Sequence, residues 1–485
     1  MNTTLLIHNA QCIATFDHED PARSLELQDA SLFIRDHRIE WMGPAAELPP
    51  TLRETASETI DARGHLVTPG LVNTHHHMYQ SLTRAIPGVQ NAELFGWLRG
   101  LYPIWTGLTP EMVQVSTQVA MAELLMSGCT TSSDHLYIYP NGVRLEDSIE
   151  AAAAIGMRFT ATRGSMSVGQ SAGGLPPDSV VEAEDAILKD SQRLIETWHS
   201  AHRGAMLQIA LAPCSPFSVS PTLMQQSALL ARSFKGQGVR LHTHLAENDH
   251  DIAYSREKFN KTPAQYAQDL GWLGDDVWHA HCVKLDDEGI SLFAATRTGV
   301  AHCPCSNMRL ASGIAPVRRL MDAGVPVGLG VDGSASNDAT HMVNEARQAM
   351  LLARVGRSLQ PPEIRDGRRF FGCDLGPAEM TARDALSLAT RGGAAVLGRT
   401  DIGHLAPGMC ADLALFDLRT LAFAGGAVHD PVASLLLCAS PPAAYTIVNG
   451  RVVVRQGQLT TLALEPLVER HNRLAVQLAE SARNA

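Results

Sequence analysis

Eight short apolar runs, each ending in polar or Gly/Pro-rich residues, recur through the middle of this 485-residue chain. Helix-length segments lie between most of them, for example 111–127, 179–199, 222–236 and 316–323. Strands that alternate with helices form parallel βαβ units, and eight such units predict an α/β chain with a closed (β/α)8 barrel of the TIM type. The predicted barrel strands are 66–74, 130–136, 157–163, 207–213, 239–245, 277–282, 299–303 and 325–332.

The two ends of the chain have a different pattern. Segments 4–16 and 30–42, and later 412–417 and 445–456, alternate in polarity and break at turns, with a hairpin expected at Asn449-Gly450. We therefore expect a small β-sandwich-like domain built from both ends. The predicted organisation is 1–65 and 401–460 for this β-domain, 66–400 for the barrel, and 461–485 for a C-terminal helix or tail in which Pro466 opens the helix.

Charge and composition narrow the range of binding partners that we expect for this chain. The net charge is −11 and is spread along the chain, which argues against nucleic acid because phosphate binding needs a basic face. No run approaches the ~20 apolar residues of a membrane span, and the N-terminus lacks a secretory signal pattern. Nine scattered cysteines do not read as a disulfide framework. We expect a reduced, cytoplasmic protein; a homo-oligomer is compatible with such a barrel, but no sequence feature defines an interface.

Three consecutive histidines follow the first predicted strand, in the sequence PGLVNTHHHMYQ at residues 69–80. Residues two apart on a strand face the same side, so His75 and His77 would both point inward. Neutral imidazole nitrogens on one rigid wall suit zinc or iron. A chance cluster of histidines at a strand end is the alternative.

Three further groups make chance a poor explanation. Each lies at the C-terminal end of a predicted barrel strand, which is the face where such barrels gather their catalytic residues. Four strand ends that converge in this way predict a metal site. The groups are LHTHLAE with His242, His244 and Glu247, WHAHC with His279 and His281, and GLGVDGSASND with Asp332.

This arrangement resembles the amidohydrolase superfamily, in its aminohydrolase branch. The shared pattern is H-x-H after the first strand, H-x-x-E after the fifth, a histidine after the sixth and an aspartate after the eighth, and the likeness extends to the segment DIGHLAPGMCADLALFD. The fourth strand, LQIALAP, has no lysine of the kind that two-metal members use, so the resemblance implies one divalent metal ion, with zinc expected and iron also suited. The implied ligands are His75, His77, His244 and Asp332.

The resemblance also implies catalytic roles. Asp332 would accept a proton from water whose pKa the metal lowers, and His281 would polarise the attacking oxygen. Glu247 would donate a proton to a ring nitrogen and help ammonia leave. A solvated loop carboxylate is the alternative for Glu247. His242 is expected behind the ligands or in the core, and His279 is expected to have no role in the site.

The substrate is expected to be a free small heterocycle, because the H-x-E and P-C-x-x-C signature of polynucleotide deaminases is absent. The loops after the first, second and fourth strands resemble those of the 8-oxoguanine deaminase group, which implies hydrolysis of 8-oxoguanine to urate and ammonia. Isoxanthopterin, guanine and hydroxylated s-triazines are the alternative substrates. Two other classes stay open, a cyclic-amide hydrolase and a non-enzymatic scaffold, and ammonia release separates the first of these from a deaminase.

The candidate substrate-binding residues follow the ends of the first, third and fourth strands. Gln80 is matched to a glutamine that binds the purine edge, since an amide can both donate and accept hydrogen bonds. Each candidate has a structural alternative, such as a rim salt bridge for Arg163 or core packing for Trp97. Asp134 and His135 would either support the metal ligands or satisfy each other. The candidates are Gln80, Arg163, Met78, Tyr79, Trp97 and Cys214.

Overall fold

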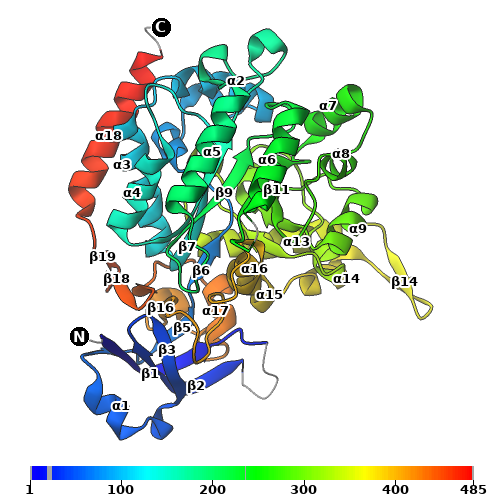
Figure 1. Cartoon of the computed structure of the whole chain (residues 1–485). Helices are drawn as coiled ribbons and strands as arrows, with labels where there is room; N and C mark the ends of the chain where they lie inside the picture. The colour runs from blue at the N-terminus through cyan, green and yellow to red at the C-terminus, as the bar shows by residue number, and fades with distance from the viewer. Residues whose placement is uncertain (1–2, 19–24, 235, 483–485) are drawn as a thin grey trace.

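The computed structural model describes residues 3–18, 25–234 and 236–482. Eight parallel strands close into a barrel in the order β10-β11-β12-β13-β6-β7-β8-β9, which confirms the predicted fold class (Figure 1). Every predicted run contributes one of these strands. They are β6 (Leu71–Asn73), β7 (Cys129–Leu136), β8 (Arg158–Ser165), β9 (Leu207–Pro213), β10 (Arg240–Leu245), β11 (Val277–His281), β12 (Gly299–His302) and β13 (Val327–Leu329).

The first predicted strand, 66–74, is wrong in one respect, because it is two strands. Its first half is β5 (His65–Pro69), which pairs with β16 (Leu413–Asp417) outside the barrel. The chain turns into the barrel at Gly70, where a Cβ atom would stand 2.1 Å from the Oγ1 of Thr130. Only glycine allows this close approach of the backbone, so the break fixes where β6 begins and where the following histidines lie.

Both chain ends build one mixed sheet, as predicted. Its path is β19-β18-β17-β16-β5-β1-β2-β3, with β4 paired to β1. Figure 1 shows this sheet below the barrel, on the side away from the C-terminal ends of the barrel strands. The remaining strands of the sheet are β1 (Thr4–Ala14), β2 (Glu26–Arg35), β3 (Arg38–Pro44), β4 (Glu58–Asp61), β17 (Tyr445–Val448), β18 (Arg451–Arg455) and β19 (Gln458–Leu459).

Helices surround the barrel, and their first turns are capped as their sequences predict. The side chains of Thr109 and Ser220 accept hydrogen bonds from backbone N–H groups of α3 and α6, each followed by a proline at the first helical position. The helices between barrel strands include α3 (Pro110–Met126), α4 (Leu145–Ile155), α5 (Glu184–Trp198), α6 (Pro221–Ser233), α7 (Asp249–Phe259), α8 (Pro263–Asp269), α9 (Asp287–Thr296), α10 (Pro304–Arg309) and α11 (Val317–Asp322).

The other helices are α2, which precedes α3 between β6 and β7, and those that lie before β6 or after β13. They are α1 (Pro50–Thr55), α2 (Leu94–Trp105), α12 (Ser334–Asn337), α13 (Met342–Ser358), α14 (Gly372–Leu375), α15 (Ala382–Ser387), α16 (Gly393–Val396), α17 (Pro431–Leu437) and α18 (Leu464–Ser481).

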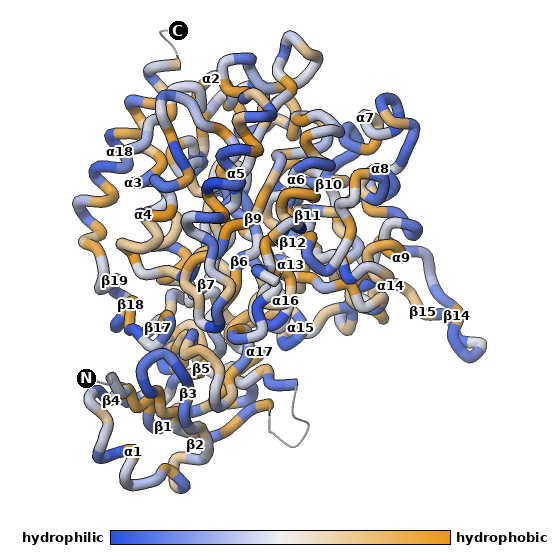
Figure 2. The backbone as a smooth tube through the Cα atoms, in the orientation of Figure 1, coloured by the Kyte–Doolittle hydropathy of each residue, from blue (hydrophilic) through white to orange (hydrophobic). Residues whose placement is uncertain are grey.

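A hairpin of β14 (Glu363–Arg365) and β15 (Arg368–Phe370) projects from the body of the protein. Its tip is hydrophilic, whereas β9 in the barrel wall is largely hydrophobic (Figure 2).

The C-terminal helix α18 begins at Leu464, two residues before the predicted start at Pro466. A proline fits anywhere in the first turn, because the N–H groups there have no partner within the helix. Helix α18 lies along α3 (Figure 1), and His471 is within 2.9 Å of the Ser81 hydroxyl. Among the described residues, no helix combines the length and hydropathy that a membrane span requires.

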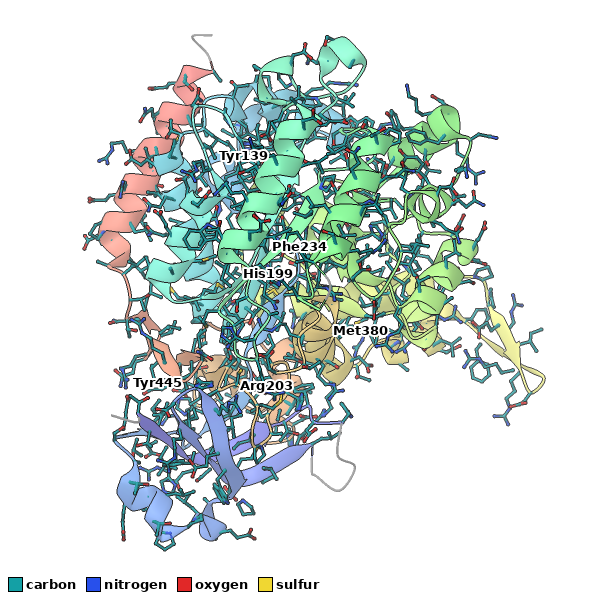
Figure 3. All side chains as sticks on the ribbon, in the orientation of Figure 1. Tyr139, His199, Arg203, Phe234, Met380 and Tyr445 are labelled. Atoms are coloured by element: carbon teal, nitrogen blue, oxygen red, sulfur yellow. The ribbon has the colours of Figure 1, made fainter. Side chains whose placement is uncertain are left out.

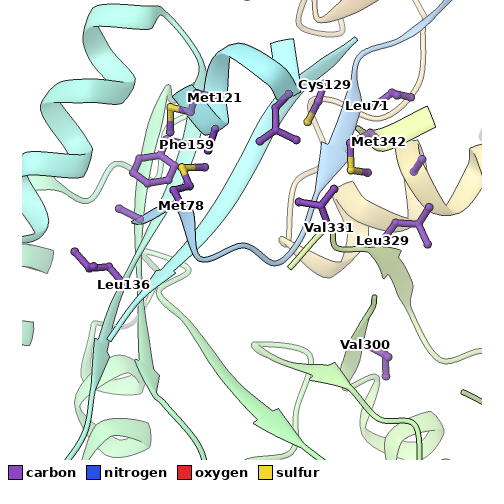
Figure 4. Close-up of a cluster of buried hydrophobic side chains, with 14 of the residues drawn as sticks. Leu71, Met78, Met121, Cys129, Leu136, Phe159, Val300, Leu329, Val331 and Met342 are labelled. Carbon is purple, nitrogen blue, oxygen red and sulfur yellow. The ribbon is translucent and has the colours of Figure 1, made fainter. Parts of the chain in front are cut away.

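A hydrophobic core fills the space between the barrel and its helices. Met78 lies beside Met121 and Phe159 in this core (Figure 4). Leu71, Leu329 and other side chains extend the same core along the barrel wall (Figure 4), so the walls that carry the candidate residues are rigid.

A buried ion pair joins the barrel to the terminal sheet. The guanidinium of Arg158, at the start of β8, donates to both carboxylate oxygens of Asp412 and to the carbonyls of Gly204 and Ala205 at 2.9 and 2.7 Å. Neither side chain of the pair is more than 2% exposed. Arg203, labelled in Figure 3, lies at the same junction. A charge at this depth needs all of these partners, because water cannot replace them.

We expect Asp412→Asn to destabilise the protein by ~3–5 kcal/mol, since it leaves the buried Arg158 charge without its partner. Urea unfolding followed by circular dichroism measures the change. Glu58→Gln is the matched control, because its partner Arg455 and Glu58 itself are both more than 40% exposed and such pairs contribute ~0–1 kcal/mol. Equal losses in the two variants would contradict the role assigned to the buried pair.

Candidate metal centre

The C-terminal ends of four barrel strands bring the six predicted metal and catalytic residues together. His75 and His77 follow β6, His244 lies in β10 with Glu247 beyond it, His281 ends β11, and Asp332 follows β13. All are buried except His244, which is partly buried. Because β6 and β13 are neighbours in the closed barrel, the backbone N–H of Asp332 donates to the His75 carbonyl at 3.1 Å.

The spacing of the four predicted ligands fits one tetrahedral ion. The Nε2 atoms of His77 and His244 are 3.1 Å apart, and the Oδ1 of Asp332 lies 3.3 Å from the Nε2 of His75 and 3.4 Å from the Nε2 of His77. Ligands placed ~2.0–2.1 Å from a tetrahedral ion stand roughly 3.3 Å from one another. The observed distances match that separation.

Hydrogen bonds on the far side of the rings show which nitrogens carry lone pairs. The Nδ1 of His77 donates to the carbonyl of His135 at 2.7 Å, and the Nδ1 of His244 donates to the carbonyl of Cys214 at 2.6 Å. A carbonyl only accepts, so both Nδ1 atoms hold the proton and both Nε2 atoms present lone pairs to each other. Lone pairs 3.1 Å apart repel unless a cation lies between them, and this arrangement therefore fits a divalent metal ion.

Asp332 is held by its own partners. Its Oδ2 accepts from the Ser306 hydroxyl at 2.6 Å, and its Oδ1 accepts from the N–H of Gly333 at 2.7 Å. The backbone of Asp332 has φ +63°, and that of His281 has φ +71°. Non-glycine residues adopt this region at a cost of ~1–3 kcal/mol each, and such strained residues cluster at functional sites.

His135 brings a fifth imidazole to the site, and the sequence patterns had left its role open. Its ligand atom lies within 4.8 Å of those of His75, His77 and His244, and a second possible group joins His75, His281 and Asp332. The Nε2 of His135 donates to the Ala212 carbonyl at 2.8 Å, while its Nδ1 has no partner in residues 3–18, 25–234 and 236–482. The ring of His135 does not pair with the Asp134 carboxylate, because its Nε2 donates to Ala212 while Asp134 accepts from the backbone N–H of Met78 at 2.8 Å.

Glu247 and His281 stand beside the predicted ligands. The Nε2 of His281 lies 3.6 Å from Oε2 of Glu247 and 3.9 Å from Oδ2 of Asp332, and its Nδ1 donates to Oδ1 of Asn307 at 3.0 Å. The orientation of the His281 ring thus depends on Asn307, which the sequence patterns did not single out.

The two carboxyl groups of the site have opposite proton affinities. Burial raises the pKa of Glu247 to about 7. Burial would also raise the pKa of Asp332, but His75 and the other nearby imidazoles hold it well below its usual range. For His281, burial opposes the charged form, yet Glu247 and Asp332 outweigh it and raise the pKa. Carboxyl groups whose pKa values are pushed apart can serve as a proton donor and a proton acceptor.

A small cavity opens in front of these groups. Three of the six predicted substrate-binding residues line it, namely Gln80, Trp97 and Cys214. Gln80 is 1% exposed, and neither its Oε1 nor its Nε2 has a hydrogen-bond partner among the described residues. An amide buried without partners is costly, so these atoms are suited to a ligand in the cavity.

The other three predicted residues lie away from the cavity. Arg163 donates to Glu182 at 2.7 Å and to Asp190 at 2.8 Å, and its guanidinium lies 4.1 Å from the ring centre of Tyr139. This is the rim salt bridge that was the structural alternative for Arg163. Met78 belongs to the hydrophobic core, and the ring of Tyr79 packs edge-on against Trp105.

Helix α2 supplies cavity residues that sequence patterns missed. Leu94, Leu98 and Tyr102 line the cavity at i, i+4 and i+8, directly beside the more aromatic row of Trp97, Leu101 and Trp105. The same helical spacing could have identified them, but their row is less aromatic. Within the described part of the chain, the hydroxyl of Tyr102 is buried without a partner, as are the amide atoms of Gln80. Tyr137 and Phe217 complete this wall.

Comparison with known proteins places this site in a family context. The family model for the amidohydrolase family matches residues 66–453. The chain is 46% identical to the 8-oxoguanine deaminase of Pseudomonas aeruginosa, over 97% of this chain and 98% of the relative. It is 36% identical to isoxanthopterin deaminase from an unknown prokaryotic organism, over 93% and 92% of the two chains.

A solved structure extends the comparison to the metal. The crystal structure of atrazine chlorohydrolase from Arthrobacter aurescens TC1 in complex with zinc has a TM-score of 0.87 and 33% sequence identity, and the likeness covers 97% of this chain and 100% of that chain. The histidine cluster described above is thus a metal site in a fold whose solved relative binds zinc.

We expect His75→Ala to weaken zinc binding by more than ~100-fold, because loss of a ligand should exceed the ~10–100-fold effect of residues behind the ligands. Zinc content after dialysis and competition with a chelator measure the change. Glu247→Gln is the control and should retain zinc, since Glu247 is not in the predicted ligand set. Full zinc content in His75→Ala would remove His75 from that set.

Proposed function

Because this chain belongs to the amidohydrolase family and is a deaminase of that family, we propose that its substrate is 8-oxoguanine, which it hydrolyses to urate and ammonia. The observation that carries the proposal is the position of the unpartnered Gln80 amide in a cavity that also opens onto His77, His244, Glu247 and Asp332. The 46% identity to a curated 8-oxoguanine deaminase over nearly the whole chain supports the same substrate.

The ligands for one divalent ion, which we propose to be zinc, are His75, His77, His244 and Asp332. Bound there, the ion would act as a Lewis acid and bring the pKa of a water molecule towards ~7. The residues themselves are pre-positioned for this role, because His77 and His244 are oriented by backbone carbonyls and Asp332 by Ser306.

Proton movements fall to the three residues beside the ligands. Asp332 remains a carboxylate and can take the proton of the attacking water on Oδ2. The Nε2 of His281 faces both Asp332 and Glu247 and can stabilise the attacking oxygen. Glu247 can hold a proton near neutral pH, give it to the ring nitrogen beside the reacting carbon, and then assist the departure of ammonia.

The cavity wall suits a planar bicyclic ring with polar edges. Trp97 and Phe217 provide aromatic surface, and Trp97 is fixed by donation from its Nε1 to the Ala335 carbonyl at 3.1 Å. Gln80 can donate to a ring nitrogen and accept from a ring N–H, while the Tyr102 hydroxyl can donate to a ring carbonyl. Arg163 has no place in this proposal, because carboxylates occupy its guanidinium.

Isoxanthopterin is the second candidate substrate, because a curated isoxanthopterin deaminase is 36% identical to this chain. A pterin offers similar carbonyl and ring-nitrogen edges to Gln80 and Tyr102, so the same residues would bind it. Guanine and hydroxylated s-triazines are further candidates that use the same chemistry. Hydrolysis of a cyclic amide would release no ammonia, and this difference separates that reaction from deamination.

The substrate proposal is tested by ammonia release from zinc-loaded protein with 8-oxoguanine, guanine, isoxanthopterin and a hydroxylated aminotriazine. We expect the highest kcat/KM for 8-oxoguanine, within ~10⁴–10⁸ M⁻¹s⁻¹. Tyr102→Phe should raise KM for that substrate by about tenfold, the effect of ~1.4 kcal/mol from one lost hydrogen bond. A higher kcat/KM for another ring would reassign the substrate while leaving the deaminase chemistry in place.

We expect Glu247→Gln to lower kcat by ~10²–10⁴-fold, because it removes the proton donor but keeps the shape of the side chain. Since burial raises the pKa of Glu247 to about 7, the protonated donor is present below that pH and is lost as the pH rises through it. The pH profile of kcat/KM should therefore fall on its alkaline side as Glu247 loses its proton. A bound cation would lower the pKa of Glu247 and move this alkaline limb to lower pH. The residual activity of the variant should lack the limb. An unchanged profile in the variant would assign the limb to another group.

A further inference from the structure

His242 lies directly behind the predicted ligand His75. It is fully buried in β10, and its Nε2 is 2.8 Å from the Nδ1 of His75. Its other nitrogen, Nδ1, is 3.0 Å from the carbonyl of Trp278, and its ring is stacked on the Trp278 indole with centroids 4.4 Å apart and planes 16° apart. The ring is therefore fixed in both position and orientation.

These contacts determine where each proton lies. The Trp278 carbonyl only accepts, so the Nδ1 of His242 carries hydrogen and donates to it. If His75 is to offer a lone pair from Nε2 to a metal ion, its Nδ1 must carry the other hydrogen. That N–H then donates to the Nε2 of His242, which must be a neutral acceptor. One chain of hydrogen bonds thus runs from the metal ligand through His242 to a backbone carbonyl.

The other two histidine ligands reach a carbonyl without an intermediary. His77 donates to the carbonyl of His135, and His244 donates to that of Cys214. Backbone carbonyls cannot be removed by substitution, and they accept whatever the state of neighbouring side chains. Among the three histidine ligands, His75 is the one whose ring orientation and tautomer rest on another side chain.

Trp278 ties the arrangement to the strand that carries His75. Its indole Nε1 donates to the carbonyl of Thr74 at 3.0 Å, next to His75 in the sequence. The same tryptophan therefore positions the backbone before His75 through its side chain and accepts the His242 proton through its carbonyl. Strands β6, β10 and β11 are linked at the level of the metal site.

We propose that His242 is a positioning residue that holds His75 in the tautomer and orientation required for metal binding. The inference rests on the ligand set of the proposed function, and it concerns metal affinity rather than substrate choice. Residues behind metal ligands typically alter metal affinity ~10–100-fold when they are replaced. The acceptor at the position of Nε2 is the feature that matters, so a side chain that restores it should restore binding.

The test is the equilibrium dissociation constant for zinc, measured by chelator competition on folded, metal-free protein without substrate. His242→Leu removes the acceptor, and His242→Gln can return an oxygen near the position of Nε2. The matched control is His279→Leu, because His279 holds the same place in its own H-x-H motif, is fully buried, and donates from Nε2 to the Trp272 carbonyl at 2.9 Å without touching a ligand. The absorption spectrum of cobalt-substituted protein reports the ligand geometry in each variant.

We expect His242→Leu to bind zinc ~10–100-fold more weakly, with an altered cobalt spectrum, while His242→Gln stays within about threefold of the parent. His279→Leu should lower the melting temperature and leave zinc affinity unchanged. Parent-like affinity in His242→Leu, or equal losses in the leucine variants at 242 and 279, would overturn the proposal. Should His242→Leu fail to fold, His242→Met, which fills the same space with a poor acceptor, takes its place.

Failure of this inference and failure of the proposed function are distinguishable. Zinc affinity is measured without a heterocycle, so an absence of ammonia release would bear on the substrate and not on His242. Conversely, unchanged zinc binding in His75→Ala would reject the ligand set itself. Unchanged binding in His242→Leu alongside a loss in His75→Ala would reject only the role of His242.

Discussion

Two imidazole nitrogens that both carry lone pairs, on His77 and His244, stand 3.1 Å apart in the mouth of the barrel. Without a cation this contact is unfavourable, and each ring could relieve it by turning. Neither ring can turn, because carbonyls behind them hold both Nδ1 protons. The walls that carry those carbonyls are in turn set by the tight packing of the barrel. Much of the architecture can be understood as the support that keeps these donors converging on one point.

Closure of the barrel is what makes the convergence possible. The first and last strands, β6 and β13, pair through Asn73 and Leu329, so residues 75 and 332 become neighbours although the rest of the barrel lies between them in the sequence. The side chain of Asn73 reinforces the seam by accepting from the N–H of Val331 at 2.9 Å. On the opposite side, Arg158 and Asp412 bind the floor of the barrel to the terminal sheet. The open, functional end and the closed, structural end of the barrel thus use different chemistry, with imidazoles at one and a buried ion pair at the other.

Periodicity could predict a histidine cluster here because every predicted ligand lies at or just beyond a strand end, where a two-residue repeat and the barrel topology together determine direction. It predicted the cavity less well. Gln80, Trp97 and Cys214 line the cavity, but Arg163 is captured by Glu182 and Asp190 from a later loop and helix, and no local pattern reveals such a contact. The break at Gly70 depends on its close approach to Thr130, a contact made across two strands. What eluded prediction is therefore what depends on distant residues meeting, as with Arg163 and its two carboxylate partners.

The construction of one sheet from both ends of the chain also bears on how the protein is made. Strand β5 emerges from the ribosome before the barrel, whereas its partner β16 emerges after it. At ~5–20 residues per second, synthesis of the intervening barrel takes on the order of tens of seconds. During that interval the N-terminal strands expose an unpaired edge of the kind that invites association with other nascent chains. The late strands β16–β19 therefore finish the sheet and end this period of vulnerability during biosynthesis.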